Sequence, residues 1–371
     1  MSNYDIKCIG CGATIQTENI NKKGYIDKKV FENRKNDEFY CKRCFDLKHY
    51  NKETKIQTSL DEYLLNLQSI KKDKGLIVYI VDTFDFEGSL IYNINDIVNS
   101  NNILLVLNKI DLYLDSLNRN KIKSYVLKYL KEKQIKIKDI MLMSSFNDND
   151  IVDLFNKIKE LHNNKNVYFV GMTNVGKSTI VNKIIKMFTG EEDIITVSNT
   201  LNTTLENIYI PLNEECYLID TPGLLNRNNL IYFLDKKTLD FITPKKYVKP
   251  RTFQLDPKQT LFVQGFVRID FVEGERSSFV ANVANNVLVH RTKLDNAIEF
   301  YEKHKDDILL FPTKQEREKL GNFVTKKVKF NKDNKIDIAI SGLGFVTVYG
   351  TGYLNITYFN NIKVIVRKAM I

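Results

Sequence analysis

The chain has 371 residues, a mass of 43.2 kDa and a formal net charge of +10. Domains usually contain roughly 100–200 residues, so this length excludes one ordinary domain and predicts two or three. The first residues lack the basic-then-apolar pattern of a secretory signal. The longest aliphatic runs, such as "GLIVYIV" at 75–81, fall far short of the ~18 apolar residues of a transmembrane helix. We therefore expect a soluble, cytoplasmic protein without membrane association.

The positive charge is concentrated at the two ends of the chain. Residues 245–371 contain 22 Lys and Arg against 13 Asp and Glu, a net +9, and residues 1–55 contain 12 against 8, a net +4. The middle is consequently slightly acidic, with a net charge of −3. This distribution predicts that the ends, rather than the centre, contact a polyanion. The alternative is that these lysines are simply solvated, because Lys, Asn and Ile are abundant everywhere in the chain.

Four cysteines near the N-terminus form two pairs with C-x-x-C spacing. Two such pairs supply the four thiolates of a tetrahedral Zn²⁺ site. We therefore predict a structural zinc ion in a domain covering residues 1–55, with the ligands Cys8, Cys11, Cys41 and Cys44. The alternatives are a redox centre, which normally has a βαβ context that these residues lack, and disulfides, which are unusual in the cytosol.

Residues 56–244 alternate aliphatic runs with amphipathic stretches, which is the pattern of an α/β domain. The expected strands cover 76–81, 103–107, 140–143, 167–170, 206–210 and 216–220. The expected helices cover 89–99, 118–134, 150–162 and 178–188. The fifth cysteine, Cys216, lies in an apolar run, so we expect it in the core rather than at a metal site.

The expected strand at 167–170 leads into "GMTNVGKST" at 171–179, which fits the phosphate-binding pattern G-x-x-x-x-G-K-[ST] between a strand and a helix. Its glycines let consecutive backbone N–H groups surround the phosphates, its lysine reaches the β- and γ-phosphates, and the next hydroxyl ligates Mg²⁺. The candidate nucleotide-binding residues in this loop are Gly171, Asn174, Val175, Gly176, Lys177, Ser178 and Thr179.

The motif "DTPG" at 220–223 follows another expected strand. Asp220 is expected to hold Mg²⁺ through water, and the N–H of Gly223 to contact the γ-phosphate. Thr204, in the polar loop before that strand, is the candidate for a second protein oxygen on Mg²⁺, with Thr203 as the alternative. The candidate catalytic residues are Asn174, Lys177, Thr204, Asp220 and Gly223.

The motif "NKID" follows the second aliphatic run and predicts recognition of guanine. The Asp111 carboxylate accepts two hydrogen bonds from the ring N–H and exocyclic amine of guanine, whereas adenine offers no such pair. Asn108 is expected to hold the loop and Lys109 to pack over the base. A backbone N–H of Ser144 or Ser145 is expected to bind the guanine carbonyl. The alternative, an ordinary turn, fits the strand-loop context less well.

The base-recognition motif precedes the phosphate-binding loop in the chain, the reverse of the usual order. A domain tolerates circular permutation when its new ends fall in loops. The sequence therefore predicts a circularly permuted P-loop GTPase domain over residues 56–244. In this order "DTPG" leads directly into residues 226–250, so a γ-phosphate contact is expected to move the segment that follows it.

The last third of the chain has a different pattern. Three of the six prolines, Pro244, Pro250 and Pro257, mark a linker. Beyond it, alternation broken by Gly and Asn predicts a β-rich α+β domain over 245–371 with one helix near 293–305. Some of its cations lie next to apolar residues and are candidates for phosphate contacts or, alternatively, solvated cations that protect edge strands. They are Lys326, Lys327, Lys329, Arg367 and Lys368.

Over nearly its whole length the chain resembles the YqeH family of circularly permuted GTPases. The resemblance rests on "CIGCGATIQTEN", "CKRCFDLKHYN", "VDTFDFEGS", "NKIDL", "GMTNVGKST", "TVSNTLNTTL", "DTPGL" and "SGLGF". It implies an N-terminal treble-clef zinc finger, an RNA-binding C-terminal domain, and an assembly factor for the small (30S) ribosomal subunit. The implied partners are guanine nucleotide, that subunit and its rRNA, with no DNA. The alternative is a GTP-dependent RNA- or protein-binding regulator outside ribosome assembly.

The sequence departs from the family pattern at a few positions. Leu201 and Asn202 stand where relatives have Pro-Gly before the paired threonines. Phe345 replaces the tryptophan of "SGLGW" and keeps an aromatic ring. Ser145 replaces a more common alanine, which is harmless if only its backbone N–H is used.

Leu224 follows "DTPG" where other GTPases have a glutamine that orients the attacking water. The family resemblance implies a substitute, a K⁺ ion that Asn174 helps to bind and that neutralises charge between the β- and γ-phosphates. The alternative is that Asn174 only braces the loop. We expect slow intrinsic hydrolysis that is faster in KCl than in NaCl.

Overall fold

A computed structural model describes residues 6–8, 14–18, 24–32, 40–42, 70, 73–98, 102–113, 117–189, 208–212, 216–224 and 226–371. The chain divides into two compact units. The first comprises Met1–Asp82, Ile91–Asn108 and Leu130–Leu225, and the second comprises Thr83–Leu90, Lys109–Tyr129 and Asn226–Ile371. No helix in the described part of the chain is long and apolar enough to cross a membrane.

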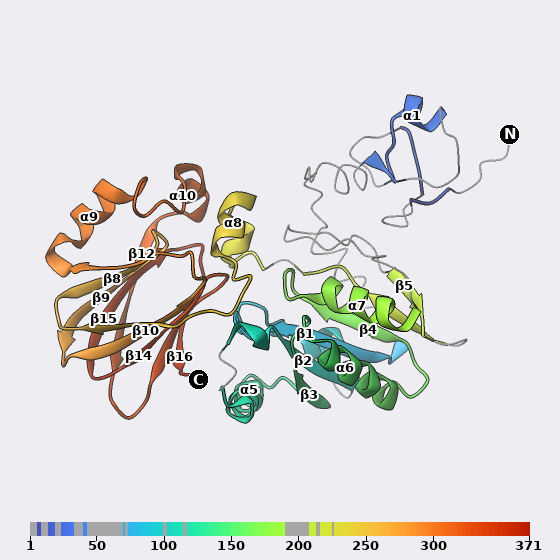
Figure 1. Cartoon of the computed structure of the whole chain (residues 1–371), viewed down its shortest axis with the longest axis horizontal. Coiled ribbons are helices and arrows are strands. Elements are labelled where there is room, and N and C mark those ends of the chain that lie inside the picture. The colour runs from blue at the N-terminus through green and yellow to red at the C-terminus, as the bar shows by residue number, and fades with distance from the viewer. Residues whose placement is uncertain are drawn as a thin grey trace. The chain divides into compact units, whose positions relative to one another are not determined.

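The first unit is built on a six-stranded sheet with the strand order β3-β2-β1-β4-β6-β5 (Figure 1). All neighbouring strands are parallel except β5, which runs antiparallel to β6. β1, β2 and β4 are buried along their whole length, which explains their unbroken aliphatic runs. The strands are β1 (Leu76–Asp82), β2 (Ile103–Asn108), β3 (Asp139–Leu142), β4 (Val167–Gly171), β5 (Ile208–Pro211) and β6 (Tyr217–Asp220).

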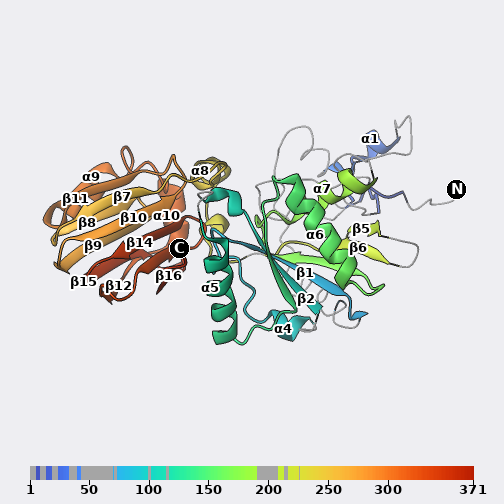
Figure 2. The same ribbon diagram turned by 60° about the horizontal axis from the view of Figure 1, so that its bottom comes forward.

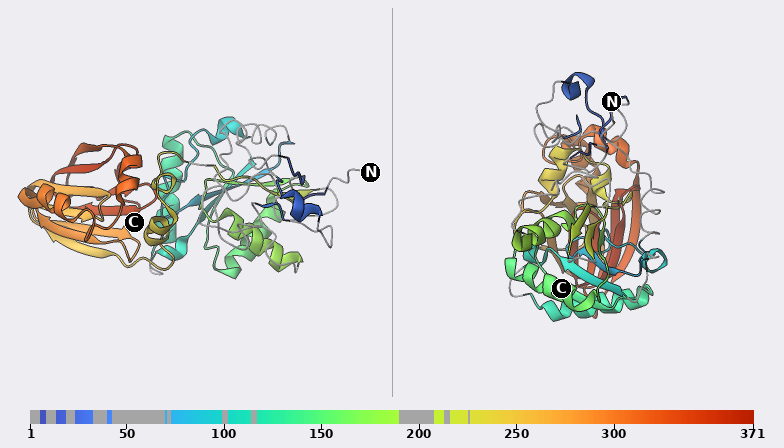
Figure 3. Two further views of the ribbon diagram at one scale, coloured as in Figure 1. Left: turned by 90° about the horizontal axis from the view of Figure 1, so that it is seen from above. Right: turned by 90° about the vertical axis from the view of Figure 1, so that its right-hand side faces the viewer.

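Two helices of this unit, α6 and α7, lie together on one side of the sheet (Figures 2 and 3). The N-terminus of α6 is capped by Asn147, whose side chain accepts a hydrogen bond from the N–H of Asn149. The buried side chains of α6 recur at helical spacing and form one face: Ile151, Leu154, Phe155 and Ile158. The helices up to this point are α1 (Lys28–Glu32), α4 (Ile94–Ile97), α5 (Arg119–Glu132), α6 (Asp148–Leu161) and α7 (Lys177–Thr189).

All six expected strands and three of the four expected helices are present, with ends shifted by at most two residues. The expected helix at 89–99 is wrong, because only Ile94–Ile97 is helical within its described residues. The N–H of Ile91 donates to the hydroxyl of Tyr79 at 2.6 Å, which holds this non-helical stretch against β1.

The second unit contains two five-stranded antiparallel sheets, with the strand orders β16-β13-β14-β10-β7 and β11-β8-β9-β15-β12. The first sheet consists of β7 (Arg251–Leu255), β10 (Ser277–Val283), β13 (Ile336–Ile340), β14 (Gly344–Tyr349) and β16 (Val364–Lys368). The second consists of β8 (Gln259–Val263), β9 (Val267–Gly274), β11 (Val289–Lys293), β12 (Phe323–Phe330) and β15 (Gly352–Phe359).

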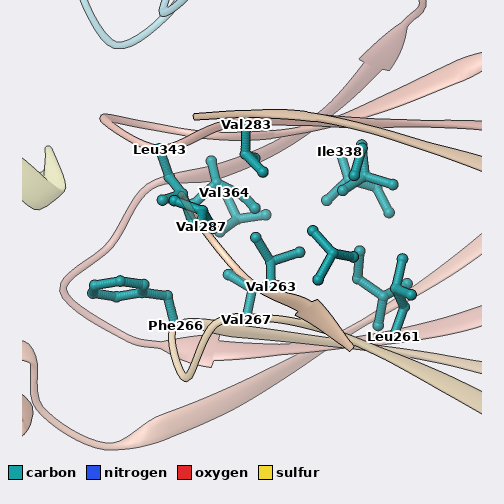
Figure 4. Close-up of a cluster of buried hydrophobic side chains, with 14 of the residues drawn as sticks. Leu261, Val263, Phe266, Val267, Val283, Val287, Ile338, Leu343 and Val364 are labelled. Carbon is teal, nitrogen blue, oxygen red and sulfur yellow. The ribbon is translucent and has the colours of Figure 1, made fainter. Parts of the chain in front are cut away.

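A hydrophobic core fills the space between these two sheets (Figure 4). Val283 and Ile338 enter it from the first sheet, and Val263 and Val267 enter it from the second. Such alternate burial along antiparallel strands is typical of sheets packed face to face. The expectation of a β-rich C-terminal part is confirmed.

The second unit includes most of α5 and, in its C-terminal part, the helices α8 (Lys236–Ile242), α9 (Ala297–His304) and α10 (Lys314–Leu320). α9 is the helix expected near 293–305, and Tyr301 on it packs with Phe262 of β8 in a small second core. The expectation of one helix in residues 245–371 is wrong, because α10 is also present. Its N-terminus is a capping box in which Thr313 and Glu316 each bind a backbone N–H of the other. The T-x-x-E spacing was therefore a readable signal for α10.

A buried ion network joins the last strand to the segment that follows β1. The guanidinium of Arg367 pairs with Glu87 through Nη1 and with Asp337 through Nε, the latter at 3.3 Å. It also lies over the ring of Tyr125, 5.8 Å from the centroid. The Arg367 side chain is only 4% exposed. The prediction that Arg367 contacts phosphate is therefore wrong, because two buried carboxylates already hold it.

Replacing Arg367 by alanine is expected to lower the free energy of unfolding by about 3–5 kcal/mol, because Glu87 and Asp337 would remain buried without a cation. The loss should shrink at low pH. Burial already raises the pKa of Asp337, so this carboxyl takes up its proton more readily in the folded state. Urea denaturation of the full chain measures the change. The exposed neighbour Lys368 supplies the control, Lys368→Ala. Similar small losses in both variants would contradict a structural role for the network.

Candidate nucleotide-binding site

The phosphate-binding pattern occupies the turn between β4 and α7. Gly171 ends β4, and Lys177 is the first residue of α7. Asn174 and Gly176 have φ values of +64° and +90°, so the loop needs the left-handed conformation twice. A Cβ at position 176 would lie 2.3 Å from Nδ2 of Asn108, so glycine is also required for space. The turn leads the first N–H groups of α7 toward one point, which suits a phosphate.

Asn108, the last residue of β2, connects this loop to the Ser144–Ser145 segment. Its Nδ2 donates to the carbonyl of Val175 at 2.8 Å, and its Oδ1 accepts from the N–H of Ser145 at 2.9 Å. The side chain is fully buried. Three segments that lie far apart in the sequence therefore meet at the carboxyl ends of neighbouring parallel strands, where α/β sheets bind ligands.

Asp150 positions the same segment and was not among the predicted site residues. It lies buried in the first turn of α6, and its Oδ2 accepts from the N–H of Ser144 at 2.8 Å. The Oγ of Ser144 in turn accepts from the N–H of Phe146 at 3.1 Å. Acidic residues are common in the first turn of a helix, so the sequence alone did not separate this role from ordinary capping.

Asp111 lies in a short 3₁₀ turn, Ile110–Leu112, directly after β2 and Lys109. Its Oδ1 is buried and has no hydrogen-bond partner among the described residues. A buried acceptor without a donor costs about 1–3 kcal/mol, so two N–H donors of a purine would be favourable here. Lys109 adopts φ +68°, which turns the chain sharply at the end of the strand.

Lys177 and Asp220 form a buried ion pair between the start of α7 and the end of β6. The ammonium donates to Oδ1 of Asp220 and to the carbonyl of Thr221. The two side chains are 5% and 0% exposed. Burial raises the pKa of Asp220, and the charge of Lys177 acts in the opposite direction. The pair brings the phosphate-contacting lysine and the metal-binding carboxylate of the prediction together.

The donors around this pair fit Mg²⁺. Oδ2 of Asp220 is buried and has no hydrogen-bond partner within the described segments. With the Ser178 hydroxyl in the first turn of α7, it offers the oxygen ligands that Mg²⁺ prefers. Thr203 and Thr204 lie outside the described residues, so the contribution of this loop stays a prediction.

The "DTPG" segment is hydrogen-bonded to the phosphate-binding loop. The N–H of Leu224 donates to the carbonyl of Gly171 at 3.1 Å, and the N–H of Thr173 donates to the carbonyl of Leu224 at 2.9 Å. A Cβ at Gly223 would lie 3.1 Å from Cγ2 of Thr173, so Gly223 passes close to the loop. This position suits an N–H contact with a γ-phosphate. The aliphatic side chain of Leu224 has no group that could orient water.

The structure describes only part of the predicted zinc site. Cys8 and Cys41 are both buried, and the N–H of Cys41 donates to Sγ of Cys8 at 3.1 Å. Cys11 and Cys44 lie outside the described residues. Within the described residues, no group of three or more His, Cys, Asp or Glu side chains is placed to bind a metal ion. Cys216 is a buried core residue, as predicted.

A glycine-containing loop between a parallel strand and a helix, with a lysine and an aspartate converging on it, defines a P-loop nucleotide-binding protein. Residues 166–260 match the sequence family described as "50S ribosome-binding GTPase", and residues 276–370 match that described as "YqeH-like, C-terminal". The chain is a P-loop GTPase and hydrolyses GTP. Strand β2, which leads into the "NKID" motif, precedes the P-loop strand β4 in the chain.

The chain belongs to the YqeH family. It is 41% identical over 367 residues to "Uncharacterized protein YqeH" of Bacillus subtilis, which covers 99% of both chains. It is 26% identical to "NO-associated protein 1, chloroplastic/mitochondrial" of Arabidopsis thaliana, over 92% of this chain and 69% of that protein. A solved structure, GNP-bound YlqF from T. maritima, is similar over 49% of this chain and 71% of that chain, with 16% identity and a TM-score of 0.31.

The Lys177–Asp220 pair predicts two separable effects of the substitution Lys177→Met. Nucleotide affinity should fall at least about tenfold, because one charge-assisted phosphate contact is lost. Without nucleotide, the variant should also be less stable by about 3–5 kcal/mol, since Asp220 stays buried without its cation. This second loss should grow as pH rises, because an Asp with a raised pKa favours the folded state only while it is protonated.

Adding Asp220→Asn to Lys177→Met should restore stability without restoring nucleotide binding. Thermal denaturation without nucleotide and titration with a fluorescent GDP analogue measure the two effects. If the double variant were no more stable than Lys177→Met alone, the buried ion pair would not be the cause of the destabilisation.

Proposed function

We propose that this GTPase is an assembly factor for the small (30S) ribosomal subunit and that it contacts rRNA through its flanking domains. The observation that carries the proposal is the charge distribution along a chain of the YqeH family. The nucleotide-binding middle is slightly acidic, whereas residues 245–371 carry a net +9 and residues 1–55 a net +4. Cationic flanking domains supply the counterion release that dominates affinity for nucleic acid.

In this proposal each site residue has a defined task. The carboxylate of Asp111 selects guanine, with Lys109 packed over the ring. The N–H groups of Ser144 and Ser145 donate to Asp150 and Asn108, so one of them would have to change partner to bind the guanine carbonyl. Lys177 contacts the β- and γ-phosphates within the cradle of backbone N–H groups. Ser178 and Asp220 hold Mg²⁺, together with Thr204 or Thr203. When bound, this ion neutralises charge that develops on the phosphate oxygens.

Two further ions are part of the proposal. Cys8, Cys11, Cys41 and Cys44 bind a structural zinc ion, which would hold together a small N-terminal domain that lacks a large apolar core. The buried pair of Cys8 and Cys41 supports this assignment. Asn174 helps to bind K⁺ in place of a catalytic glutamine, since Leu224 cannot orient water.

Nucleotide state would be relayed through the segment that follows "DTPG". Asn229 Nδ2 donates to Oδ2 of Asp85 at 2.7 Å, and the N–H of Leu230 donates to the carbonyl of Ser341 at 3.2 Å. The N–H of Lys363 donates to the carbonyl of Asn228 at 3.0 Å. The chain that leaves Gly223 is therefore anchored to the cationic C-terminal part a few residues later. Movement at Gly223 would pull on these anchors.

Co-sedimentation with purified small ribosomal subunits tests the proposed function. With a non-hydrolysable GTP analogue, we expect the amount of full chain that pellets with the subunit to be at least about fivefold greater than with GDP. The reason is that hydrolysis would drive release. Binding should weaken steeply with salt if rRNA phosphates provide the contact. Large subunits serve as the control particle. Binding that ignores the nucleotide, or that prefers the large subunit, would favour the alternative of a regulator outside 30S assembly.

The role of Asp111 is tested by the substitution Asp111→Asn. An amide presents one donor and one acceptor, so it cannot accept both N–H donors of guanine. It can instead pair with xanthine, which carries a carbonyl where guanine has its amine. We expect GDP affinity to fall at least about 100-fold and affinity for xanthosine diphosphate to rise, because unpaired buried polar groups reject the wrong base. Competition against fluorescent GDP measures both changes. An unchanged preference for GDP would remove Asp111 from the base site.

A further inference from the structure

Strand β12 is the end strand of the second sheet and remains open on one side. It pairs with β15 from Phe323 to Phe330 and has no neighbour on its other side within the described chain. Its first five residues, Phe323–Lys327, are all exposed. An open strand of eight residues presents unpaired backbone N–H and C=O groups that another strand can bind.

One face of β12 forms an outward-pointing row. Phe330 lies in the core between the two sheets and Val328 packs against it, so the alternate side chains point away from that core. The residues of this row are Phe323, Thr325, Lys327 and Lys329. Their partners across β15 are Phe359, Thr357, Asn355 and Tyr353. The row therefore passes from aromatic through hydroxyl to cationic side chains.

A pocket of about 230 Å³ opens at the aromatic end of this row. Phe323 of β12 and Ile298 and Tyr301 of α9 line it, together with residues of β8, β9 and β15. Ile298 is 67% exposed and Phe323 is 44% exposed, so two apolar side chains stand at its mouth. Exposed apolar groups around a concave site mark a place where another apolar group binds.

The other end of the row is cationic. Neither Lys327 nor Lys329 forms an ion pair with a described residue, and Nζ of Lys329 lies 5.4 Å from the ring centroid of Tyr353. Lys326 adds a third positive charge to the strand. Two copies of this edge would repel each other, which disfavours edge-to-edge pairing of the chain with itself. A partner with negative charge would be attracted.

We propose that β12 is the docking edge for an extended, acidic segment of a partner protein. The segment adds a strand beside β12, places one apolar side chain in the pocket, and sets two carboxylates against Lys327 and Lys329. Side chains on one face of a strand recur every second residue, and these lysines lie four and six positions beyond Phe323. The partner segment therefore carries acidic residues four and six positions from an apolar one.

Polypeptide fits this surface better than RNA does. Backbone N–H and C=O groups along an open edge are matched by another backbone, whereas nucleotides offer no complementary ladder. Phosphates and bases could contact the lysines and the pocket, but they would leave the open backbone groups of β12 unpaired. The combination of edge, pocket and cations at strand spacing favours a peptide.

Two synthetic nine-residue peptides test the proposal. Each peptide carries Leu at one end, Glu four and six positions from it, and Thr elsewhere. Leu is N-terminal in one peptide and C-terminal in the other, because β12 can pair with a parallel or an antiparallel strand. Fluorescence anisotropy with the full chain should detect binding of one of them. A matched peptide with Lys in place of Glu should bind at least about tenfold more weakly, because it meets Lys327 and Lys329 with like charge. If neither acidic peptide binds, the proposal fails.

Variants of exposed residues locate the contact. Lys327→Glu combined with Lys329→Glu should weaken peptide binding about tenfold or more, and Ile298→Asp should do so by altering the pocket. Lys293→Glu, at an exposed position on β11 at the opposite end of the sheet, is the control and should change little. Circular dichroism of each variant confirms that the fold is retained. Equal weakening by Lys293→Glu would overturn the docking edge.

Hydrogen exchange separates strand addition from other binding. Bound peptide should slow exchange of backbone N–H groups in residues 323–330, because those on the open edge gain acceptors. A ten-nucleotide oligouridylate is the competing probe. If the RNA binds this surface more tightly than either peptide, or if peptide binding leaves exchange in residues 323–330 unchanged, the surface is not a site of strand addition.

Discussion

The nucleotide site depends on the side-chain amide of Asn108. One end of this amide binds the phosphate loop at Val175 and the other end binds the base-side loop at Ser145, and both bonds are buried. Each bond is worth only about 1 kcal/mol in net terms, but a buried partner left unpaired costs more. One planar group therefore sets the spacing between the place for the purine and the place for the phosphates. Tertiary hydrogen bonds fix this spacing, and the order of the segments in the sequence does not. Reversing that order therefore leaves the site intact.

Around that frame two buried carboxylate oxygens, Oδ1 of Asp111 and Oδ2 of Asp220, have no donor among the residues that the structure describes. A carboxylate in this situation is costly unless a cation or strong donors reach it. Lys177 offsets part of the cost at Asp220, and in the proposed nucleotide complex its ammonium would contact the phosphates. In that proposal, donors of the purine would satisfy Asp111, and a metal ion would satisfy Asp220.

The sequence predicted most of this site because its chemistry is local. The P-loop, "NKID" and "DTPG" each follow a buried aliphatic strand, and an unbroken aliphatic run is what a central parallel strand requires. Features that depend on distant partners were missed. Asp150 looked like an ordinary helix-start residue, and Arg367 looked like a surface cation until Glu87 and Asp337 were seen to enclose it. The expected helix at 89–99 was also wrong, because only Ile94–Ile97 is helical within its described residues. The roles of Thr204 and of the zinc cysteines stay predictions.

The hydrogen bonds of the segment after "DTPG" support the proposed relay of nucleotide state. Asp85 accepts from both the Asn229 amide and the N–H of Gly342, at 2.7 and 2.9 Å, so one carboxylate joins this segment to a turn of the C-terminal sheets. Gly342 has φ +87°, and a Cβ there would lie 2.2 Å from Oδ1 of Asn229. The two residues are therefore closely packed, and there is no room for a side chain at position 342. Within a few residues of "DTPG", Asn226 donates to the carbonyl of Gly88 and Asn228 accepts from the N–H of Lys363. The proposed relay would therefore act on contacts that lie close to Gly223 along the chain.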